Sequence, residues 1–300
     1  MTCREATEAV GGVDSVDYDM SGLVAASREL GLDCSVVAWD DPTVDWSRFA
    51  VSVLRSTWNY FMDREGFLEW ARRVAGVSDL HNDLAIVEWN TDKHYLAEIA
   101  RAGLPVVPTT FLEPDHGDWR AEIVRLLDHG DVVVKPCVSA GSNDTDRHSA
   151  VDSAVSHVES LLDAGRSVML QPYLADVDTY GETGLVFIDG VFSHAFGKGA
   201  ILAAEKNMTG GLYAEEDISA REATAAEREL GERAVDFLRE RFGDPLYARV
   251  DLLPTADGPV IIEVELTEPS LYLALGDSAA RAVAAAVARR VDRRSGRSVE

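Results

Sequence analysis

The sequence has few basic residues, few cysteines and no long hydrophobic run. Its 300 residues include 28 Lys plus Arg against 52 Asp plus Glu, which gives a formal net charge of −24. Nucleic-acid-binding proteins use basic surfaces against phosphate, so this charge argues against a nucleic-acid partner. No segment reaches the roughly 18 to 20 apolar residues that span a bilayer, and no signal-peptide pattern is present. We therefore expect a cytoplasmic protein without a membrane partner.

The three cysteines, Cys3, Cys34 and Cys137, are odd in number and show no paired metal-ligand spacing. This pattern predicts neither a zinc site nor a disulfide framework, and we expect reduced thiols. Cys137 follows a strand and has no histidine at a telling spacing, so it is interpreted as a small packing residue.

Lysine is the scarcest basic residue. Only Lys93, Lys135, Lys198 and Lys206 are lysines, whereas the other 24 basic residues are arginines. A compact ammonium on a flexible stem differs chemically from a guanidinium. The four lysines are therefore the first candidates for a functional site.

Helical and strand patterns alternate along the chain. The expected helices are 20–30, 64–74, 92–102, 119–129, 152–163, 220–242 and 271–293. The expected strands are 34–39, 51–55, 106–111, 132–135, 168–171, 183–188, 191–196, 246–253 and 260–266. This order predicts a mixed α/β (α+β) fold.

The same pattern divides the chain into an N-terminal α/β domain (1–90), a connecting helix (91–104), a small middle domain (105–174) and a C-terminal domain (175–300). Such a series normally opens with a strand, and polar sequence follows Met1, so we expect a missing first strand and a true start upstream. Asp189-Gly190 predicts a type I′ hairpin turn, and 197–217 predicts a long loop.

The strongest chemical pattern is in the last two strands. Arg249 and Asp251 alternate with aliphatic residues, and so do Glu263 and Glu265. Alternation places each polar pair on one face, so three carboxylates and a guanidinium would converge. This face is either exposed to solvent or holds a cation. Like charges opposite each other on paired strands are destabilising unless a cation neutralises them, which favours the cation. Hard oxygen ligands suit Mg²⁺.

Two further patterns are weaker alone. The strand ending at Lys135-Pro136 opens a loop of small residues in which Ser139, Gly141 and Ser142 could wrap phosphate, although a surface turn is an alternative. The strand carrying Gln171 runs into Tyr173 and Leu174, with Asp178 downstream. This segment could bind an adenine edge and a ribose, or be a plain linker.

Lys93 is expected on the first turn of the helix 92–102. A cation at a helix N-terminus interacts unfavourably with the helix dipole. Its presence is explained if Lys93 and the helix amides bind the same anion, and a solvated lysine is the alternative.

These residues resemble the ATP-grasp ligases. Three motifs carry the resemblance: Lys93 in Trp89-Asn90-Thr91-Asp92-Lys93, Lys135-Pro136, and the pair Arg249-Val250-Asp251 with Glu263-Val264-Glu265. The resemblance implies an ATP-grasp fold in which the middle domain is a lid and ATP lies between it and the C-terminal domain. It implies that Lys93 and Lys135 contact phosphates, and that Arg249 lies near the transferred phosphoryl group.

The resemblance also implies the remaining ligand contacts. Gln171, Tyr173 and Leu174 would frame adenine, Asp178 would bind ribose, and Asp251, Glu263 and Glu265 would hold two Mg²⁺ ions. Many members of the family carry Asn at the position of Glu265, so this metal site would be more negative than usual.

A closer likeness is to a branch of small bacterial ATP-grasp enzymes that includes the cyclo-ligase of D-cycloserine biosynthesis. It rests on four segments: Arg55-Ser56-Thr57-Trp58-Asn59-Tyr60, Glu182, Ser193-His194-Ala195-Phe196-Gly197-Lys198 and Glu265-Leu266-Thr267-Glu268-Pro269. It implies substrate contacts from Arg55, Ser56, Thr57, Trp58, Tyr60, Glu182 and Glu268, and a catalytic role for Lys198. Arg55 at a strand end suits a carboxylate. Trp58 and Tyr60 could equally be packing residues, and His194 ranks below Lys198.

The expected enzyme activates the carboxylate of a small amino acid as an acyl phosphate, which a nitrogen then attacks. The closer likeness implies cyclisation of O-ureido-D-serine to D-cycloserine. The alternatives are an intermolecular carboxylate–amine ligase and a non-catalytic ATP-binding regulator. We expect a homo-oligomer. We also expect Lys206 to reach the phosphates of ATP when the loop that carries it closes.

Overall fold

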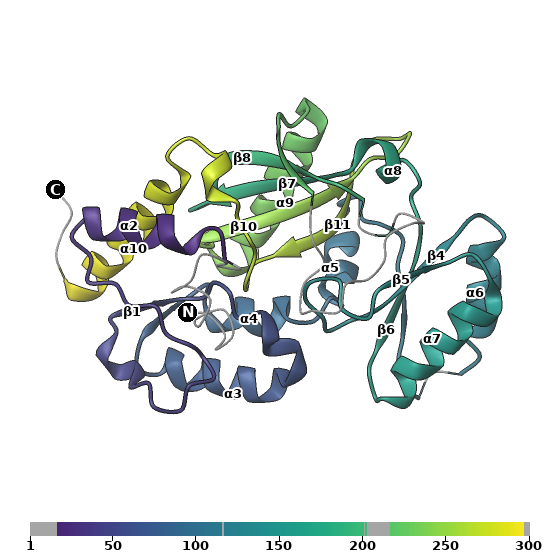
Figure 1. Ribbon diagram of the computed structural model, residues 1–300, viewed down its shortest axis with the longest axis horizontal. Coiled ribbons are helices and arrows are strands. Elements are labelled where there is room, and N and C mark those ends of the chain that lie inside the picture. Colours follow the sequence, from purple (N-terminus) through teal and green to yellow (C-terminus); the bar gives the residue numbers. More distant parts are fainter. Residues whose placement is uncertain (1–16, 116, 201, 203–216, 297–300) are drawn as a thin grey trace.

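The computed structural model describes residues 17–115, 117–200, 202 and 217–296, which form three sheets with flanking helices (Figure 1). Lys206 and Gly210-Gly211 of the expected loop lie outside these residues, as does the expected site of a missing first strand. None of the helices in the described ranges has the length and apolar character that crossing a membrane requires.

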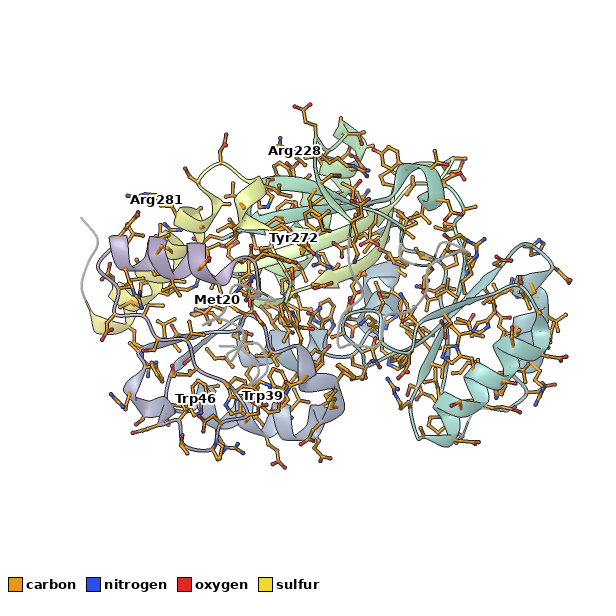
Figure 2. The ribbon with its side chains drawn as sticks, in the orientation of Figure 1. Met20, Trp39, Trp46, Arg228, Tyr272 and Arg281 are labelled. Carbon is orange, nitrogen blue, oxygen red and sulfur yellow. The ribbon has the colours of Figure 1, made fainter. Side chains whose placement is uncertain are left out.

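The N-terminal layer contains a small parallel sheet of β1 (Val51–Val53) and β2 (Asp79–His81). The helix α3 (Arg64–Ala75) links the two strands and begins where the Asp63 carboxylate accepts a hydrogen bond from the Gly66 amide. Its apolar face packs into an aromatic cluster, in which the ring centroid of Trp70 lies 5.8 Å from that of Trp39 and 5.3 Å from that of Trp46. Trp39 and Trp46 are labelled in Figure 2. The helix α2 (Met20–Glu29) instead lies beside the C-terminal helix α10 (Ala279–Ser295) (Figure 1).

Two expectations for this part of the chain are wrong. Residues 34–39 form no strand, because among the described residues they make no hydrogen-bonded ladder and only Ala38 forms a single bridge. The expected helix 92–102 is divided differently: α4 (Leu84–Asn90) ends before Lys93, and α5 (Tyr95–Arg101) begins after it. Lys93 therefore lies in the turn between two helices and not on a first helical turn.

The middle sheet has the order β3-β6-β4-β5 and is antiparallel. Its strands are β3 (Thr110–Leu112), β6 (Val168–Pro172), β4 (Val132–Pro136) and β5 (Asp146–His148). The helices α6 (Arg120–Leu127) and α7 (Val151–Asp163) cover one face (Figure 1). Val132 and Val134 of β4 pack against these helices, so Val133 and Lys135 face the opposite side.

The C-terminal sheet has the order β11-β10-β7-β8-β9 and is antiparallel throughout. Its strands are β7 (Glu182–Ile188), β8 (Val191–Lys198), β9 (Ile218–Arg221), β10 (Tyr247–Leu253) and β11 (Val260–Glu265), and the short helix α8 (Val177–Tyr180) precedes them. Asp189 and Gly190 have φ of 53° and 78°, which confirms the positive-φ turn predicted between β7 and β8.

The helix α9 (Ala225–Phe242) covers the apolar face of this sheet and begins five residues later than expected. Two features displace its start. Residues 218–221 pair with β8 as an additional strand, and Thr224 with Glu227 forms a capping box that fixes the first turn. The expected helix 271–293 also begins later, at Ala279, after a short 3₁₀ turn at Leu273–Leu275.

Candidate active site

A cavity of about 500 Å³ lies between the middle sheet and the C-terminal sheet. It is lined by most of the residues that the sequence predicted for ATP, metal and substrate. These are Trp58, Lys93, Lys135, Ser139, Gly141, Ser142, Gln171, Tyr173, Leu174, Glu182, Lys198, Arg249, Glu263, Glu265 and Glu268. The fold therefore brings together segments that are far apart in the sequence.

The charged faces of β10 and β11 meet as predicted. Asp251 pairs with Glu263 and Arg249 with Glu265 in the strand register. The Arg249 guanidinium lies 2.6 Å from the Asp251 carboxylate and also donates to Glu265. Lys93 Nζ lies 3.0 Å from a Glu263 oxygen. Cationic side chains of the protein thus pair with these carboxylates, and Asp251, which Arg249 contacts, does not line the cavity.

These cations do not neutralise the carboxylates completely. Burial raises the pKa of Glu265 well above its usual range despite the neighbouring Arg249. Burial likewise raises the pKa of Glu182 and of Glu268 to about 7. Burial also disfavours the charged form of Glu263, but Lys93 and Lys135 outweigh it and lower the pKa. A bound Mg²⁺ would stabilise the charged forms of these buried carboxyl groups, whose oxygens are ligands that Mg²⁺ prefers.

All three lysines in the part of the chain that the structure describes line the cavity. Lys93 Nζ donates to the Ser139 carbonyl oxygen over 2.9 Å. Lys135 has few neutralising contacts, and burial lowers its pKa to about 8. Lys198 Nζ lies 3.7 Å from Glu182, its cross-strand partner. This clustering agrees with the prediction from lysine scarcity.

The loop after β4 forms one wall of the cavity. Gly141 and Ser142 both have positive φ, of 60° and 58°, so the backbone turns tightly beneath Lys93. Ser139 is buried and Thr145 also lines the wall. A tight loop of small residues can present amides and hydroxyls to phosphate oxygens.

The predicted adenine segment lies at the end of β6. Gln171 Nε2 donates to Thr109 Oγ1 over 2.8 Å, which fixes the amide beside the cavity. Tyr173 and Leu174 line the cavity next to it. Asp178 does not line it, because its carboxylate accepts from the Tyr173 hydroxyl and lies 3.6 Å from Arg147. The structure therefore does not place Asp178 where the expected ribose contact requires it.

The predicted substrate residues divide into two groups. Trp58, Glu182 and Glu268 line the cavity, and Trp58 Nε1 donates to the Glu268 carbonyl oxygen over 2.9 Å. Arg55, Ser56, Thr57 and Tyr60 are buried and do not line it.

Arg55 is occupied by another partner. It forms an ion pair with Asp19 over 3.0 Å, and both side chains are almost completely buried. Ser56 donates to Asp17. Because these groups already bind aspartates, the expectation that Arg55 receives the substrate carboxylate does not agree with its position.

Sequence reasoning missed several residues that line the cavity, including Tyr18, Ser270 and Tyr272. Tyr272 has a φ of 48°, which is unusual for a residue with a side chain, and its backbone amide donates to Asp19. Tyr18 stands between two buried aspartates, Asp17 and Asp19. That alternation was the one available indication that this segment is anchored.

Comparison with known proteins identifies the family. Residues 1–82 match the family described as the D-cycloserine synthetase DcsG, N-terminal domain. The chain is also 38% identical over 291 residues to the cycloserine biosynthesis protein DcsG of Streptomyces lavendulae, an alignment covering 92% of this chain and 95% of that protein. The chain belongs to the D-cycloserine synthetase family of ATP-grasp ligases.

Structural comparison agrees with this family. The crystal structure of D-cycloserine synthetase DcsG superposes with a TM-score of 0.86 at 37% identity and covers 97% of this chain and 98% of that chain. The D-alanine–D-alanine ligase of Bacillus anthracis shares the fold, with a TM-score of 0.65 at 14% identity and 93% of both chains covered. As a member of the D-cycloserine synthetase family, the protein is an ATP-dependent carbon–nitrogen ligase.

Proposed function

We propose that the protein closes the ring of D-cycloserine from O-ureido-D-serine with hydrolysis of ATP to ADP. The observation that carries the proposal is the single cavity that joins three lysines and Arg249 to a pocket lined by Trp58 and Glu268. The cationic part suits the phosphates of ATP, and the smaller part suits a short amino acid. The sequence identity to a cycloserine biosynthesis protein supports the same reaction.

We propose the following chemistry. A carboxylate oxygen of the substrate attacks the γ-phosphorus of ATP, the bond to the β-phosphate oxygen breaks, and ADP leaves. The ureido nitrogen attached to oxygen then attacks the acyl phosphate carbon, and inorganic phosphate leaves. Water removes the carbamoyl group as CO₂ and ammonia.

The residues of the chain would act mainly by position and charge. Lys93 and Lys135 would bind phosphate oxygens, and Lys198 with Arg249 would stabilise charge on the transferred phosphoryl group. Ser139, Gly141 and Ser142 would hold the phosphates, and Gln171, Tyr173 and Leu174 the adenine. Glu263 and Glu265, together with Asp251, would hold Mg²⁺, and the number of acids suggests two ions. Bound Mg²⁺ supplies charge neutralisation between the phosphates.

The substrate itself would lie against Trp58, Glu182 and Glu268. Glu268 lines the cavity, and its carboxyl group suits the ammonium group of an amino acid. We further propose three domains at 1–90, 105–174 and 175–300, with residues 91–104 connecting the first two. We propose a cytoplasmic location, where ATP is supplied. We also propose a homo-oligomer, which light scattering would test.

The test is a panel of carboxylates screened for ADP release, with the products identified by mass. We expect O-ureido-D-serine alone to give stoichiometric ADP, phosphate and D-cycloserine. ADP release that requires a second amine would favour the intermolecular ligase, and no substrate-dependent release would favour a regulator. The Glu263→Gln variant, purified identically, controls for contaminating ATPase.

A further inference from the structure

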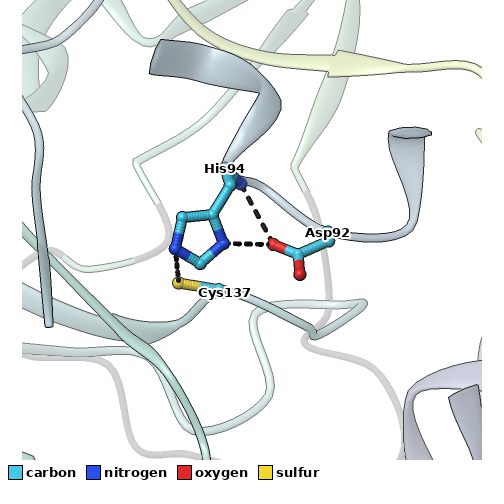
Figure 3. Close-up of side chains that lie close together, drawn as sticks. All are labelled: Asp92, His94 and Cys137. Atoms are coloured by element: carbon cyan, nitrogen blue, oxygen red, sulfur yellow. Dashed lines mark hydrogen bonds and ion pairs between the residues drawn. The ribbon is translucent and has the colours of Figure 1, made fainter. Parts of the chain in front are cut away.

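A second polar cluster lies behind the loop that carries Lys93, outside the cavity lining (Figure 3). His94 Nδ1 lies 2.6 Å from Asp92 Oδ1, and His94 Nε2 lies 2.9 Å from Glu113 Oε1 and 3.9 Å from Cys137 Sγ. The four residues come from the turn before α5 and from the ends of β3 and β4. One potential ligand atom from each of Asp92, His94 and Cys137 lies within 4.8 Å of the others.

The hydrogen bonds determine which imidazole nitrogen is available. The Asp92 carboxylate also accepts from the His94 backbone amide over 3.1 Å, so it is fixed beneath the ring. A carboxylate only accepts, so Nδ1 carries the proton that it donates to Asp92. Nε2 faces the Glu113 carboxylate oxygen and the Cys137 sulfur, so it carries either a second proton or a metal ion in place of that proton. A metal ion at this position would contact Nε2, Glu113 and Cys137 together.

The surrounding contacts hold the same groups in place. Ser167 Oγ donates to the other Glu113 oxygen over 2.5 Å, and the Cys137 amide donates to the Ser167 carbonyl oxygen over 2.9 Å. Phe111 stacks on the His94 ring at 4.5 Å. Burial, with the charges of Asp92 and Glu113, strongly raises the pKa of the Cys137 thiol. A positive ion at this point would reverse that effect.

We propose that His94 Nε2, Cys137 Sγ and Glu113 Oε1 bind a divalent cation of the zinc class, with Asp92 orienting the imidazole. Nitrogen, thiolate and carboxylate ligands suit Zn²⁺, whereas Mg²⁺ prefers oxygen alone. A carboxylate that holds the distal nitrogen is a regular partner of metal-bound histidine. On binding, the thiol loses its proton to solvent.

The bound ion would join three segments that surround the phosphate-binding part of the cavity. The Lys93 amide donates to the Cys137 carbonyl oxygen over 2.9 Å, so His94 and Cys137 flank the lysine directly. A metal here would fix the Lys93 turn to the ends of β3 and β4. Because only the folded protein presents these ligands together, the metal should raise the unfolding temperature.

The test is titration of the full-length, metal-free protein with Co²⁺, which reports thiolate ligation by a charge-transfer absorption band in the near ultraviolet. We expect one equivalent of Co²⁺ to produce the band, Zn²⁺ to abolish it, and millimolar Mg²⁺ to leave it unchanged. Cys137→Ser should remove the band, and Asp92→Asn should weaken binding about 10- to 100-fold. Cys34→Ser should keep the band, because that thiol is elsewhere.

A second group, Asp146, His148 and His157, also places ligand atoms within 4.8 Å. It has no thiol, so His148→Ala is a matched control that should leave the cobalt band unchanged. If Cys137→Ser reduces folding, Glu113→Gln at the half-exposed rim tests the same site by weaker Zn²⁺ binding and a smaller rise in unfolding temperature. Absence of a band in the wild type, or a band that survives Cys137→Ser, would overturn the proposal in favour of a protonated His94 between two carboxylates.

Discussion

Glu263 is subject to two opposing influences at the floor of the cavity. It faces Asp251 across the strand pair, which favours removing one charge, and it is paired with Lys93 over 3.0 Å, which favours keeping it. The sequence alone indicates only the repulsion between the two carboxylates. The structure adds the ion pair with Lys93. Removing the Glu263 charge therefore relieves the repulsion but also breaks the ion pair, and the two effects on protein stability partly cancel. The proposed metal-binding role of Glu263 is unaffected by this balance.

We therefore predict that Glu263→Gln lowers turnover by about 100-fold or more while the protein stays folded. The glutamine keeps the volume and can accept a hydrogen bond from Lys93, so the unfolding temperature should change by only a few degrees. Steady-state ADP release and thermal unfolding provide the measurements. A variant with normal turnover at ordinary Mg²⁺ concentrations would show that Glu263 is not a metal ligand.

Lys135 is a buried cation whose pKa is lowered to about 8. We predict that Lys135→Ala weakens ATP binding by about tenfold or more, because a buried ammonium contacting phosphate is lost. ATP affinity of the wild type should also fall as pH rises above about 8, since the lysine then loses its charge. Isothermal titration at several pH values measures both effects.

Two variants control this prediction. Arg281→Ala removes an exposed cation on α10, far from the cavity, and should leave ATP affinity unchanged (Figure 2). Lys135→Arg stays charged at pH 9 and should flatten the pH dependence. Equal ATP affinity in Lys135→Ala and Arg281→Ala would mean that the scarcity of lysine was misleading.

At the scale of elements, Asp19 joins the start of α2 to the segment before α10. Its carboxylate accepts from the amides of Leu271, Tyr272 and Leu273 and pairs with Arg55. This anchor holds Tyr272 at the cavity wall in its positive-φ conformation. The ion pair with Asp19 also explains why Arg55, which the sequence predicted as a substrate contact, does not line the cavity.

We predict that Asp19→Ala destabilises the protein by about 3 to 5 kcal/mol, because Arg55 is left buried without its partner. The matched control is Glu29→Ala at the other end of α2, where the ion pair with Arg281 is exposed and worth less than about 1 kcal/mol. Urea denaturation of both variants measures the difference. Similar midpoints for the two variants would contradict the anchoring role.

The sequence predicted elements well where a local pattern determines them. The β7–β8 turn, the charged face of β10 and β11, and α7 follow from alternation, helical periodicity and turn chemistry. The strand predicted at 34–39 does not form among the described residues, because a strand needs a paired neighbour and no local pattern reveals one. The start of α9 was missed because the Thr224 cap outweighed the helical pattern upstream.

The site was predictable only in part for the same reason. Lysines and strand-borne acids stand out in the sequence, so the charged side chains that line the cavity, within the described residues, were predicted. Tyr18 and Tyr272 reach the cavity through the Asp19 anchor, which spans more than two hundred residues of sequence. The cluster around His94 joins residues from three segments with no motif spacing, and therefore the sequence predicted no metal site there.

The whole molecule has a net charge of −24, and four glutamates line its cavity: Glu182, Glu263, Glu265 and Glu268. Burial raises the pKa of Glu182 and Glu268 to about 7, above their ordinary range. Folding therefore favours their protonated forms. Their contribution to stability is fully present below the unfolded-state pKa and is lost as pH rises toward 7.

We accordingly predict that these two groups lower the unfolding temperature of the ligand-free protein between about pH 5 and 7, and that Mg²⁺ with ADP reduces the loss. Glu268→Gln should make the pH dependence shallower, because one of the titrating groups is removed. Thermal unfolding across this pH range, with and without Mg-ADP, is the measurement. An identical pH dependence in Glu268→Gln and wild type would contradict the assignment.

In the proposed reaction, phosphoryl transfer in this cavity activates a substrate carboxylate. The most direct measurement uses O-ureido-D-serine labelled with ¹⁸O in its carboxylate, followed by mass analysis of the inorganic phosphate released with Mg-ATP. We predict that one ¹⁸O atom is transferred to each phosphate formed during ring closure, because the carboxylate oxygen stays on phosphorus when the nitrogen displaces phosphate from the carbon. Phosphate without label, produced alongside D-cycloserine, would contradict the acyl phosphate route and the function proposed for this site.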